Sequence, residues 1–330
     1  MIIIDKLKAL KLRLINMKIL MMDFKQMLKF SSGMEKVHVR KATLERDLIV
    51  LSHTIEKGLS HKNIKPLFGR KIVKSLLENL NLYIKYKDLN RYYVVYASSI
   101  LKKYIETNIN VGVSKSDLPI ILDELNEYVT DKCGAYRISE KDFFTPCLSN
   151  FTDLAKARHS VRLYDTKSDE IEKDVIKKCV DVAQLSPSAC NRQATRVHVI
   201  YDKKKIKELS NIQGGARGFG ENSGVMVIIT QDLRYYYAFE RRIPMYDAGL
   251  FSMTFIYALF ENRIGSCVLN GSLSLEQERH VREIVDIAPC EMIASFIALS
   301  KIPKNQSIGL AKSYKKSSDE ITYYVDDKNE

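Results

Sequence analysis

Polar and apolar residues alternate along the chain from Arg158 to Leu163. In an extended backbone, alternate side chains point to the same side, so Arg158, Ser160 and Arg162 converge on one face. Val161 and Leu163 then point to the core. Two guanidinium groups with a hydroxyl between them suit a phosphate monoester, because each planar group donates paired hydrogen bonds and keeps its charge. The pattern predicts an anion-binding segment, although any half-exposed strand alternates in this way.

A helix, a turn and a strand follow this segment. Apolar spacing predicts a helix over 169–185, with Asp169 and Glu172 in the positions of a capping box. Its apolar stripe consists of Ile171, Val175, Cys179, Val182 and Ala183. The dipeptide Ser186-Pro187 ends the helix, because proline cannot continue it. A turn over 188–193 and an apolar strand over 197–201 come next.

This combination resembles the FMN-dependent nitroreductase superfamily over residues 151–326. The similar motifs are Arg158-His159-Ser160-Val161-Arg162 and Pro187-Ser188-x-x-Asn191-x-Gln193. The resemblance implies a bound FMN whose phosphate and ribitol contact the first motif and whose isoalloxazine ring lies against the second. The implied cofactor ligands are Arg158, His159, Ser160, Arg162, Pro187, Ser188, Ala189, Asn191 and Gln193.

The second motif also has its own chemistry. The carboxamide of Asn191 offers a donor and an acceptor, as the pyrimidine edge of a flavin requires, although asparagine after proline is also a common turn former. The chain departs from the family where Ala194-Thr195 replaces a proline and often a tryptophan, and it contains no tryptophan at all. We therefore expect a pocket shaped for an unusual second substrate.

The remainder of the second half predicts an α+β fold. Strands are expected over 225–230, 264–270 and 292–300, a buried helix over 248–260, and a helix that begins with the capping-box pair Ser274 and Gln277. The resemblance implies a nitroreductase-like mixed sheet flanked by helices, with the helix over 248–260 at the core of a homodimer that binds FMN at its interface. A last strand is expected over 321–325, which could be added to the sheet of a dimer partner.

Two further pairs of residues are implied as cofactor ligands by the resemblance. A backbone amide at Asn270 or Gly271 would face the flavin, and Lys315 and Lys316 would bind its phosphate. Lysine runs near chain ends are more often solvated surface, so that interpretation stays open for the lysines. No catalytic side chain is expected, because a flavin performs the bond chemistry itself.

The first half predicts a smaller all-α domain over 1–150, ahead of the domain over 151–330. Helices are expected near 41–57, 70–86, 91–107 and 116–129. A linker is expected over 142–150, docked through its two phenylalanines. His53 and Glu56 have a spacing that can hold a metal, but without a second such pair we expect no metal site, with Glu56 an ordinary helix charge and Gly58 the end of the helix.

The N-terminal 30 residues predict an amphipathic helix. An alternating four-three spacing forms an apolar seam, made of Ile3, Leu7, Leu10, Leu14, Met17, Met21, Phe24 and Leu28. Interspersed lysines and arginines exclude a signal-peptide core or a membrane span within these residues. The seam could pack on its own domain, on a dimer partner, or on an anionic membrane as a peripheral contact.

The composition gives the apolar content, the charge distribution and the cysteine content of the two predicted domains. Of 330 residues, 45% are apolar, which is enough for packed cores in two domains. Residues 1–150 carry 26 lysines and arginines against 16 acidic residues, whereas residues 151–330 carry 26 against 24. The six cysteines show no C-x-x-C pair and follow no signal-peptide core, so we expect reduced thiols and a cytoplasmic protein. Cys190, inside the turn, is expected to be structural rather than redox-active.

Three functions compete at this point. The resemblance favours an FMN oxidoreductase that passes a hydride from NADH or NADPH to a small-molecule acceptor such as a nitroaromatic or quinone. The second is another flavin enzyme on the same scaffold, such as a dehalogenase, an azoline oxidase or a flavin-fragmenting enzyme. The third is a non-enzymatic basic protein that binds a membrane or a polyanion through residues 1–150. The first function involves no nucleic acid.

Overall fold

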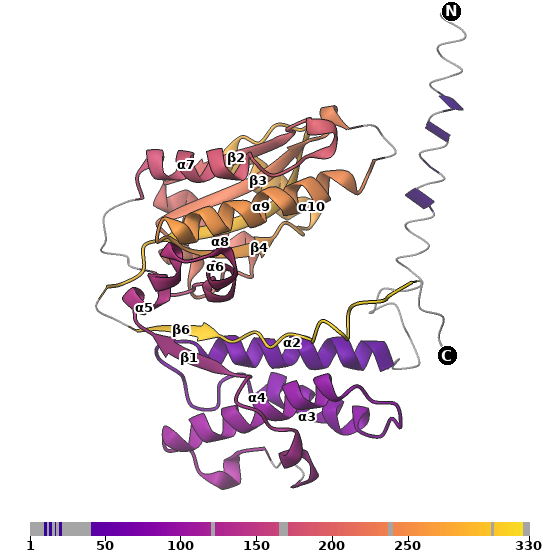
Figure 1. Cartoon of the computed structure of the whole chain (residues 1–330), viewed down its shortest axis with the longest axis vertical. Helices are drawn as coiled ribbons and strands as arrows, with labels where there is room; N and C mark the ends of the chain where they lie inside the picture. Colours follow the sequence, from indigo (N-terminus) through magenta and orange to yellow (C-terminus); the bar gives the residue numbers. More distant parts are fainter. Residues whose placement is uncertain are drawn as a thin grey trace, which may run out of the picture. The chain divides into compact units, whose positions relative to one another are not determined.

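A computed structural model describes residues 10, 11, 13, 14, 17, 20, 21, 41–119, 123–164, 171–236, 240–304 and 307–325. It divides the chain into two compact units (Figure 1). One comprises Ser139–Ile308 with Met1–Met34, and the other Glu35–Ile138 with Gly309–Glu330. Compared with the predicted ranges of 1–150 and 151–330, the division falls earlier and the C-terminal segment joins the helical unit.

The sheet of the first unit has the strand order β2-β3-β5-β4. The strands are β2 (Thr195–Ile200), β3 (Val225–Asp232), β4 (Gly265–Asn270) and β5 (Glu291–Ser300). Every residue of β3 is buried, because helices cover both faces of the sheet. The α+β class is confirmed, and all pairings between these four strands are antiparallel where a mixed sheet was expected.

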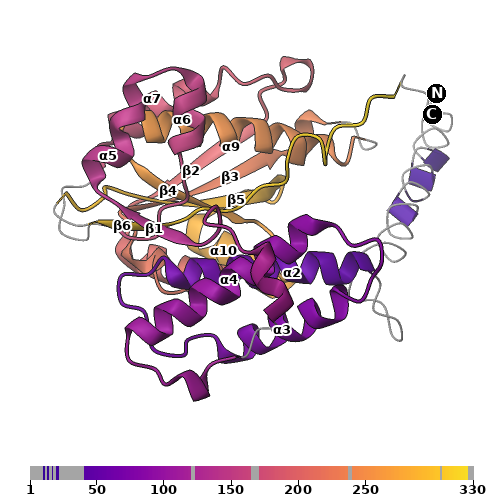
Figure 2. The same cartoon turned by 60° about the horizontal axis from the view of Figure 1, so that its bottom comes forward.

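Helices of this unit lie on both faces of the sheet, and Figure 2 shows α9 and α10 on opposite sides of it. Their bounds are α5 (Glu140–Phe144), α6 (Phe151–Ala157), α7 (Lys173–Ala183), α8 (Lys203–Gln213), α9 (Ile243–Glu261) and α10 (Leu275–Val285). Alternate residues of β3, namely Val225, Val227 and Ile229, form one core with α7 and α9. This alternation follows from the two-residue period of a strand.

Most element predictions in this unit hold, with shifted ends. Helix α10 begins with the predicted capping box of Ser274 and Gln277. Helix α7 begins at Lys173, and Asp169 lies outside the described residues. Val182 was expected in the apolar stripe but is 38% exposed, and Ile176 is buried instead. Successive residues lie about 100° apart around a helix, so Val182 points away from the face that its fully buried neighbour Ala183 presents to the core.

Helix α9 is the central helix of this unit. It is the one described helix long and apolar enough to cross a membrane by length and composition alone, but 56% of the apolar window is buried within the protein. Core helices have the same composition. Phe260 near its end contacts Phe143 and Phe144 at ring distances of 5.0 and 5.3 Å, so the predicted linker is docked, as a helical turn and not as a loop.

Three helices form the core of the second unit: α2 (Lys41–Leu59), α3 (Arg70–Tyr83) and α4 (Arg91–Asn110). They match the first three predicted helices. The predicted helix over 116–129 is wrong, because two 3₁₀ turns, Lys115–Asp117 and Asp123–Tyr128, are found instead. Pro119 lies between them, and proline disfavours the helical backbone at the residue before it.

Glu56 is a buried carboxylate, and the prediction that it is an ordinary helix charge is wrong. It is 0% exposed and accepts hydrogen bonds from the backbone nitrogen of Gly134 at 3.0 Å and the hydroxyl of Tyr96 at 2.9 Å. His53 Nδ1 lies 3.2 Å from it. Such a carboxylate needs its donors, because a buried charge without partners is costly. Among the described residues, no group of three potential metal ligands is found.

The C-terminal segment is part of the helical unit. Strand β6 (Ile308–Ala311) pairs with β1 (Ala135–Ile138), two strands that were not predicted. Beyond β6, Tyr314 stacks on Tyr92 with ring centroids 5.3 Å apart. Within the single chain, residues 321–325 form no strand, and Tyr323 and Val325 are exposed; the addition of this segment to a partner's sheet stays a prediction. A strand needs a hydrogen-bonded neighbour, and none is provided by the described part of the chain.

Candidate functional site

The alternating segment follows helix α6 directly. Its backbone is extended at Arg158, and the Val161 nitrogen donates to the Ser266 carbonyl of β4 at 2.9 Å. Val161 is 1% exposed, as predicted, whereas Leu163 is only half-buried. The segment is therefore held beside β4 by this hydrogen bond and by Val161, without forming a regular strand.

Arg158 and Ser160 line the same pocket, which has a volume of about 420 Å³. Arg162 does not line it, and its guanidinium lies over the Phe219 ring at 5.9 Å. The predicted convergence of three polar side chains therefore holds for two of them. The third differs because the segment is not a flat strand, so its alternate side chains diverge.

Arg158 is the most informative side chain in this pocket. Its Nε is buried and has no hydrogen-bond partner in the part of the chain that the structure describes. Burial lowers the pKa of Arg158, but an arginine in a protein remains protonated. A buried donor without a partner is uncommon and calls for an acceptor. The pocket thus offers an uncompensated positive charge to an anion.

The other walls of this pocket are mostly apolar or carry hydroxyls. They are formed by Met245, Ala248, Gly249, Ser252, Met253 and Ile256 of α9, Val268 of β4, and Ala294 and Ser295 of β5. Gly271, the residue after β4, lies against the backbone of β5: a Cβ at Gly271 would lie 2.5 Å from the Ala294 carbonyl oxygen. Only glycine permits this approach. Such a surface can hold a flat, partly apolar ring with a phosphate at one end.

The predicted turn has an unusual backbone. Cys190, Asn191 and Gln193 all have positive φ angles, of 52°, 55° and 52°. Non-glycine residues rarely adopt this conformation, and they do so mainly at functional sites held by their surroundings. The Ser188 hydroxyl accepts from the Gln193 nitrogen at 3.1 Å and closes the turn. The turn therefore has a fixed shape, which leaves Asn191 exposed.

Asp247 of α9 stabilises the backbone of the turn. It is 3% exposed, and its two carboxylate oxygens each lie 3.2 Å from the Ala189 nitrogen. The Tyr236 hydroxyl donates to it at 2.9 Å and also contacts Gln231 at 2.9 Å. Burial raises the pKa of Tyr236, so the hydroxyl keeps its proton and remains a donor. The carboxylate thus fixes the backbone of the turn at Ala189 and is itself held by Tyr236.

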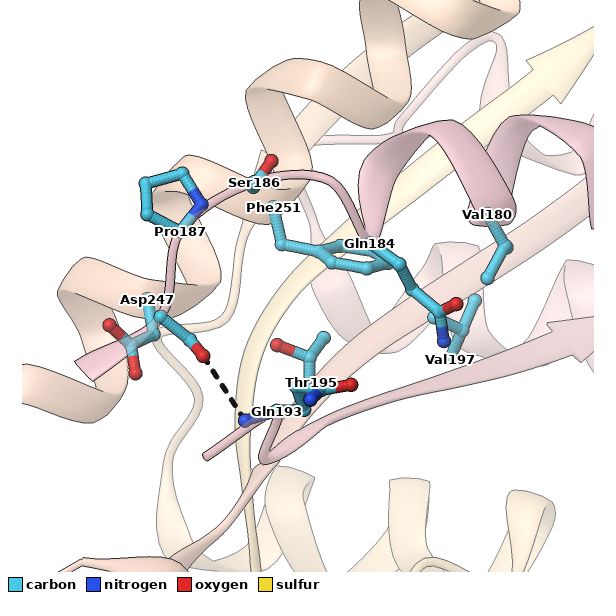
Figure 3. Close-up of a pocket in the computed structure, with 10 residues that line it drawn as sticks. Val180, Gln184, Ser186, Pro187, Gln193, Thr195, Val197, Asp247 and Phe251 are labelled. Carbon is cyan, nitrogen blue, oxygen red and sulfur yellow. Dashed lines mark hydrogen bonds between the residues drawn. The ribbon is translucent and has the colours of Figure 1, made fainter. Parts of the chain in front are cut away.

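A second, smaller pocket of about 50 Å³ lies between the turn and α9. Figure 3 shows Pro187 and Gln193 of the turn around it, with Asp247 and Phe251 from α9. Ser188 and Thr195 also line it, and Thr195 accepts from the Gln231 side chain at 2.8 Å. This pocket shares no lining residue with the pocket of Arg158. In a single chain, the two predicted motifs therefore line separate pockets.

We expect Asp247→Ala to lower the free energy of unfolding by about 2–3 kcal/mol, because the Ala189 nitrogen and the Tyr236 hydroxyl lose a charged acceptor. Asp247→Asn should lose less, since an amide oxygen still accepts. Urea titration measures both. The matched control is Asp181→Ala, whose exposed ion pair with Lys177 contributes roughly 0.5 kcal/mol or less. Equal effects of Asp247→Ala and Asp181→Ala would refute this role.

The remaining predicted ligands make contacts elsewhere in the structure. His159 Nδ1 lies 2.8 Å from the Ala157 carbonyl, and Asn270 accepts from the Gln213 side chain at 3.1 Å through its backbone oxygen. Lys316 belongs to the helical unit, where it donates to the Tyr93 hydroxyl at 2.6 Å. Neither Lys315 nor Lys316 lines the two pockets described above. Their role as phosphate ligands stays a prediction.

Sequence reasoning missed Asp247, Ser252 and Ser295. A signal for Asp247 was present, because it directly precedes the apolar run 248–260 and is an acid inside the longer α9. An acid at that position is also typical of a helix N-terminus, which conceals its buried role. The two serines gave no signal. They face the pocket only because α9 and β5 pack beside each other.

A model of a known protein family matches part of this chain. Residues 155–216 match the model of the nitroreductase family. This range contains the alternating segment, α7 and the turn, so the match confirms the resemblance that these motifs predicted. No match was found among functionally curated proteins.

Solved structures with this similarity span about half of the chain. The FMN-dependent nitroreductase of Clostridium difficile R20291 is 19% identical, with a TM-score of 0.44, and the match covers 52% of this chain and 98% of that one. A nitroreductase family protein of Streptococcus pneumoniae TIGR4 is 19% identical, with a TM-score of 0.45 and coverages of 53% and 100%. A nitroreductase-like protein of Streptococcus mutans is 17% identical, with a TM-score of 0.47 and coverages of 53% and 98%.

Proposed function

We propose that this protein is an FMN-dependent oxidoreductase of the nitroreductase type. The observation that carries the proposal is the buried Arg158 donor without a partner, in a pocket that Ser160 also lines. A phosphate would accept from both groups, and charge-assisted hydrogen bonds to phosphate are the strongest that an arginine makes. The family match over these same residues supports the choice of FMN.

The residues present fit this cofactor. Arg158 and Ser160 would hold the phosphate and ribitol, and the apolar walls from α9 and β5 would lie along the ring. Pro187, Ser188, Asn191 and Gln193 of the rigid turn would contact a flavin from their side. FMN, when bound, accepts a hydride from a nicotinamide and passes two electrons to an acceptor such as a nitroaromatic or a quinone. The protein orients both substrates and excludes water.

We also propose that the site is completed in a homodimer. The two motifs line separate pockets on α9, so two chains paired along this helix would bring the pocket of one to the turn of the other. Helix α9 exposes Met245 (51%), Tyr246 (65%) and Met253 (38%), three large side chains that a second chain would cover. Exposed apolar patches of this kind are typical of protein interfaces.

A visible absorption spectrum of the purified protein tests the proposed function. We expect two flavin bands that bleach when NADH or NADPH is added without oxygen and return when a nitroaromatic or a quinone follows. Bands that resist both nucleotides would indicate another flavin chemistry on this fold. If the protein contains no flavin and does not bind added FMN, the proposal is wrong.

A further inference from the structure

An apolar seam near the N-terminus is exposed. The residues described between 10 and 21 are all helical, and four of them lie on the seam: Leu10 (53% exposed), Leu14 (50%), Met17 (63%) and Met21 (52%). Their spacing of four, three and four places them on one face of the helix. No described part of the chain covers this face.

Basic residues flank the seam on both sides. Lys11 follows Leu10 on one edge, Arg13 precedes Leu14 on the other, and both are exposed. In a heptad they take the two positions that border the apolar seam. The first 30 residues contain seven lysines and arginines and only two aspartates. The seam therefore lies in a strip of positive charge.

This charge pattern opposes pairing with a second copy of the same helix. In a parallel pair, position 13 of one helix faces position 18 of the other, and position 6 faces position 11; these residues are arginine or lysine throughout. In an antiparallel pair, each edge meets its own equivalent: one edge repeats Lys11, Lys18 and Lys25, and the other carries Lys6 and Arg13 followed by Leu20 and Met27. Like charges on these edges repel, so the complementary partner is negatively charged.

We propose that this helix binds the surface of an anionic lipid bilayer. The seam would enter the boundary between headgroups and acyl chains, and Lys11 and Arg13 would reach the lipid phosphates beside it. An apolar stripe bordered by lysine and arginine is the pattern that interfacial helices use. Such binding would hold the whole protein at a membrane without any segment that crosses it.

Vesicle co-sedimentation of the full-length protein tests this proposal. We expect binding to vesicles rich in phosphatidylglycerol, at least about tenfold weaker binding to pure phosphatidylcholine, and weakening as salt is raised. The double variants Leu14→Asp/Met17→Asp and Lys11→Glu/Arg13→Glu should each lose at least about tenfold in affinity. Leu275→Asp, at a leucine that is 90% exposed in α10, is the matched control and should bind as the wild type does.

Three results would overturn the proposal. They are no binding to anionic vesicles, equal binding to neutral ones, or unchanged binding by both double variants. If the wild type forms a larger oligomer that Leu14→Asp/Met17→Asp dissolves, and neither binds vesicles, the seam pairs with a second copy instead. Flavin content measured in the same samples keeps this test separate from the proposed function, because the seam residues line neither pocket.

Discussion

Arg158→Ala should reduce the affinity for FMN by about 10- to 100-fold, and the purified variant should be largely colourless. The substitution removes a charged donor from a buried position, and a hydrogen bond to a charged group contributes roughly 1.5–3 kcal/mol. The FMN affinity of Arg158→Lys should lie between those of the wild type and Arg158→Ala, since lysine restores the charge but not the planar pair of donors. Titration of the flavin-free proteins with FMN, followed by flavin fluorescence, measures all three affinities.

Stability separates a binding role of Arg158 from a structural one. Because the buried Nε of Arg158 has no partner among the described residues, Arg158→Ala should leave the unfolding midpoint of the flavin-free protein unchanged or higher. Arg279→Ala is the matched control, because that side chain is 74% exposed and has only a 3.9 Å ion pair with Glu283. Arg279→Ala should change neither the FMN affinity nor the unfolding midpoint. Wild-type FMN affinity in Arg158→Ala would contradict the proposed site.

Gly309→Ala should destabilise the helical unit by about 3 kcal/mol or more, the range of severe core substitutions. A Cβ at Gly309 would lie 1.7 Å from the backbone oxygen of Ser60. No rotamer change relieves a collision with backbone, so β6 must move away from its place beside β1. The hydrogen bond from the Lys312 nitrogen to the Gly134 carbonyl, 2.9 Å long, would be lost with it.

Limited proteolysis shows whether Gly309→Ala loosens the chain at β6 and in the residues that follow it. Trypsin should cleave the variant rapidly at Lys312, Lys315 or Lys316, whereas the wild type should resist there. Gly249→Ala, compared in the flavin-free protein because Gly249 lines the proposed cofactor pocket, is the control. Outside its own helix backbone, no atom lies within 4 Å of a Cβ at Gly249, and alanine is more favourable than glycine in a helix by about 1 kcal/mol. Equal stability and equal cleavage of Gly309→Ala and the wild type would show that β6 does not pack in this way.

Arg158 and Gly309 differ in how far the local sequence reveals their roles. The position of Arg158 could be predicted from alternation and from the motif, because both are local in the sequence. Its missing partner could not, since that depends on every atom that approaches from β4, β5 and α9. Gly309 gave no signal at all. Its need for glycine arises from Ser60, a residue nearly 250 positions earlier in the chain.

The sequence by itself determined the α+β class, the three main helices of the first half, the buried helix over 248–260, and the two motifs. Each of these depends on a short period or on capping and turn residues, which act over a few positions. A break such as Pro119 is equally local, and its effect on the expected helix could have been predicted.

Tertiary structure alone decided the return of the C-terminal segment to the helical unit, the burial of Glu56 and Asp247, and the separation of the two motifs into different pockets. A carboxylate in a helix is favourable on the surface, and only the donors that surround it make it favourable inside. Gly134 for Glu56 and Ala189 for Asp247 are distant in sequence from the acids they serve. Periodicity carries no information about such distant contacts, because they form only when the packed elements meet.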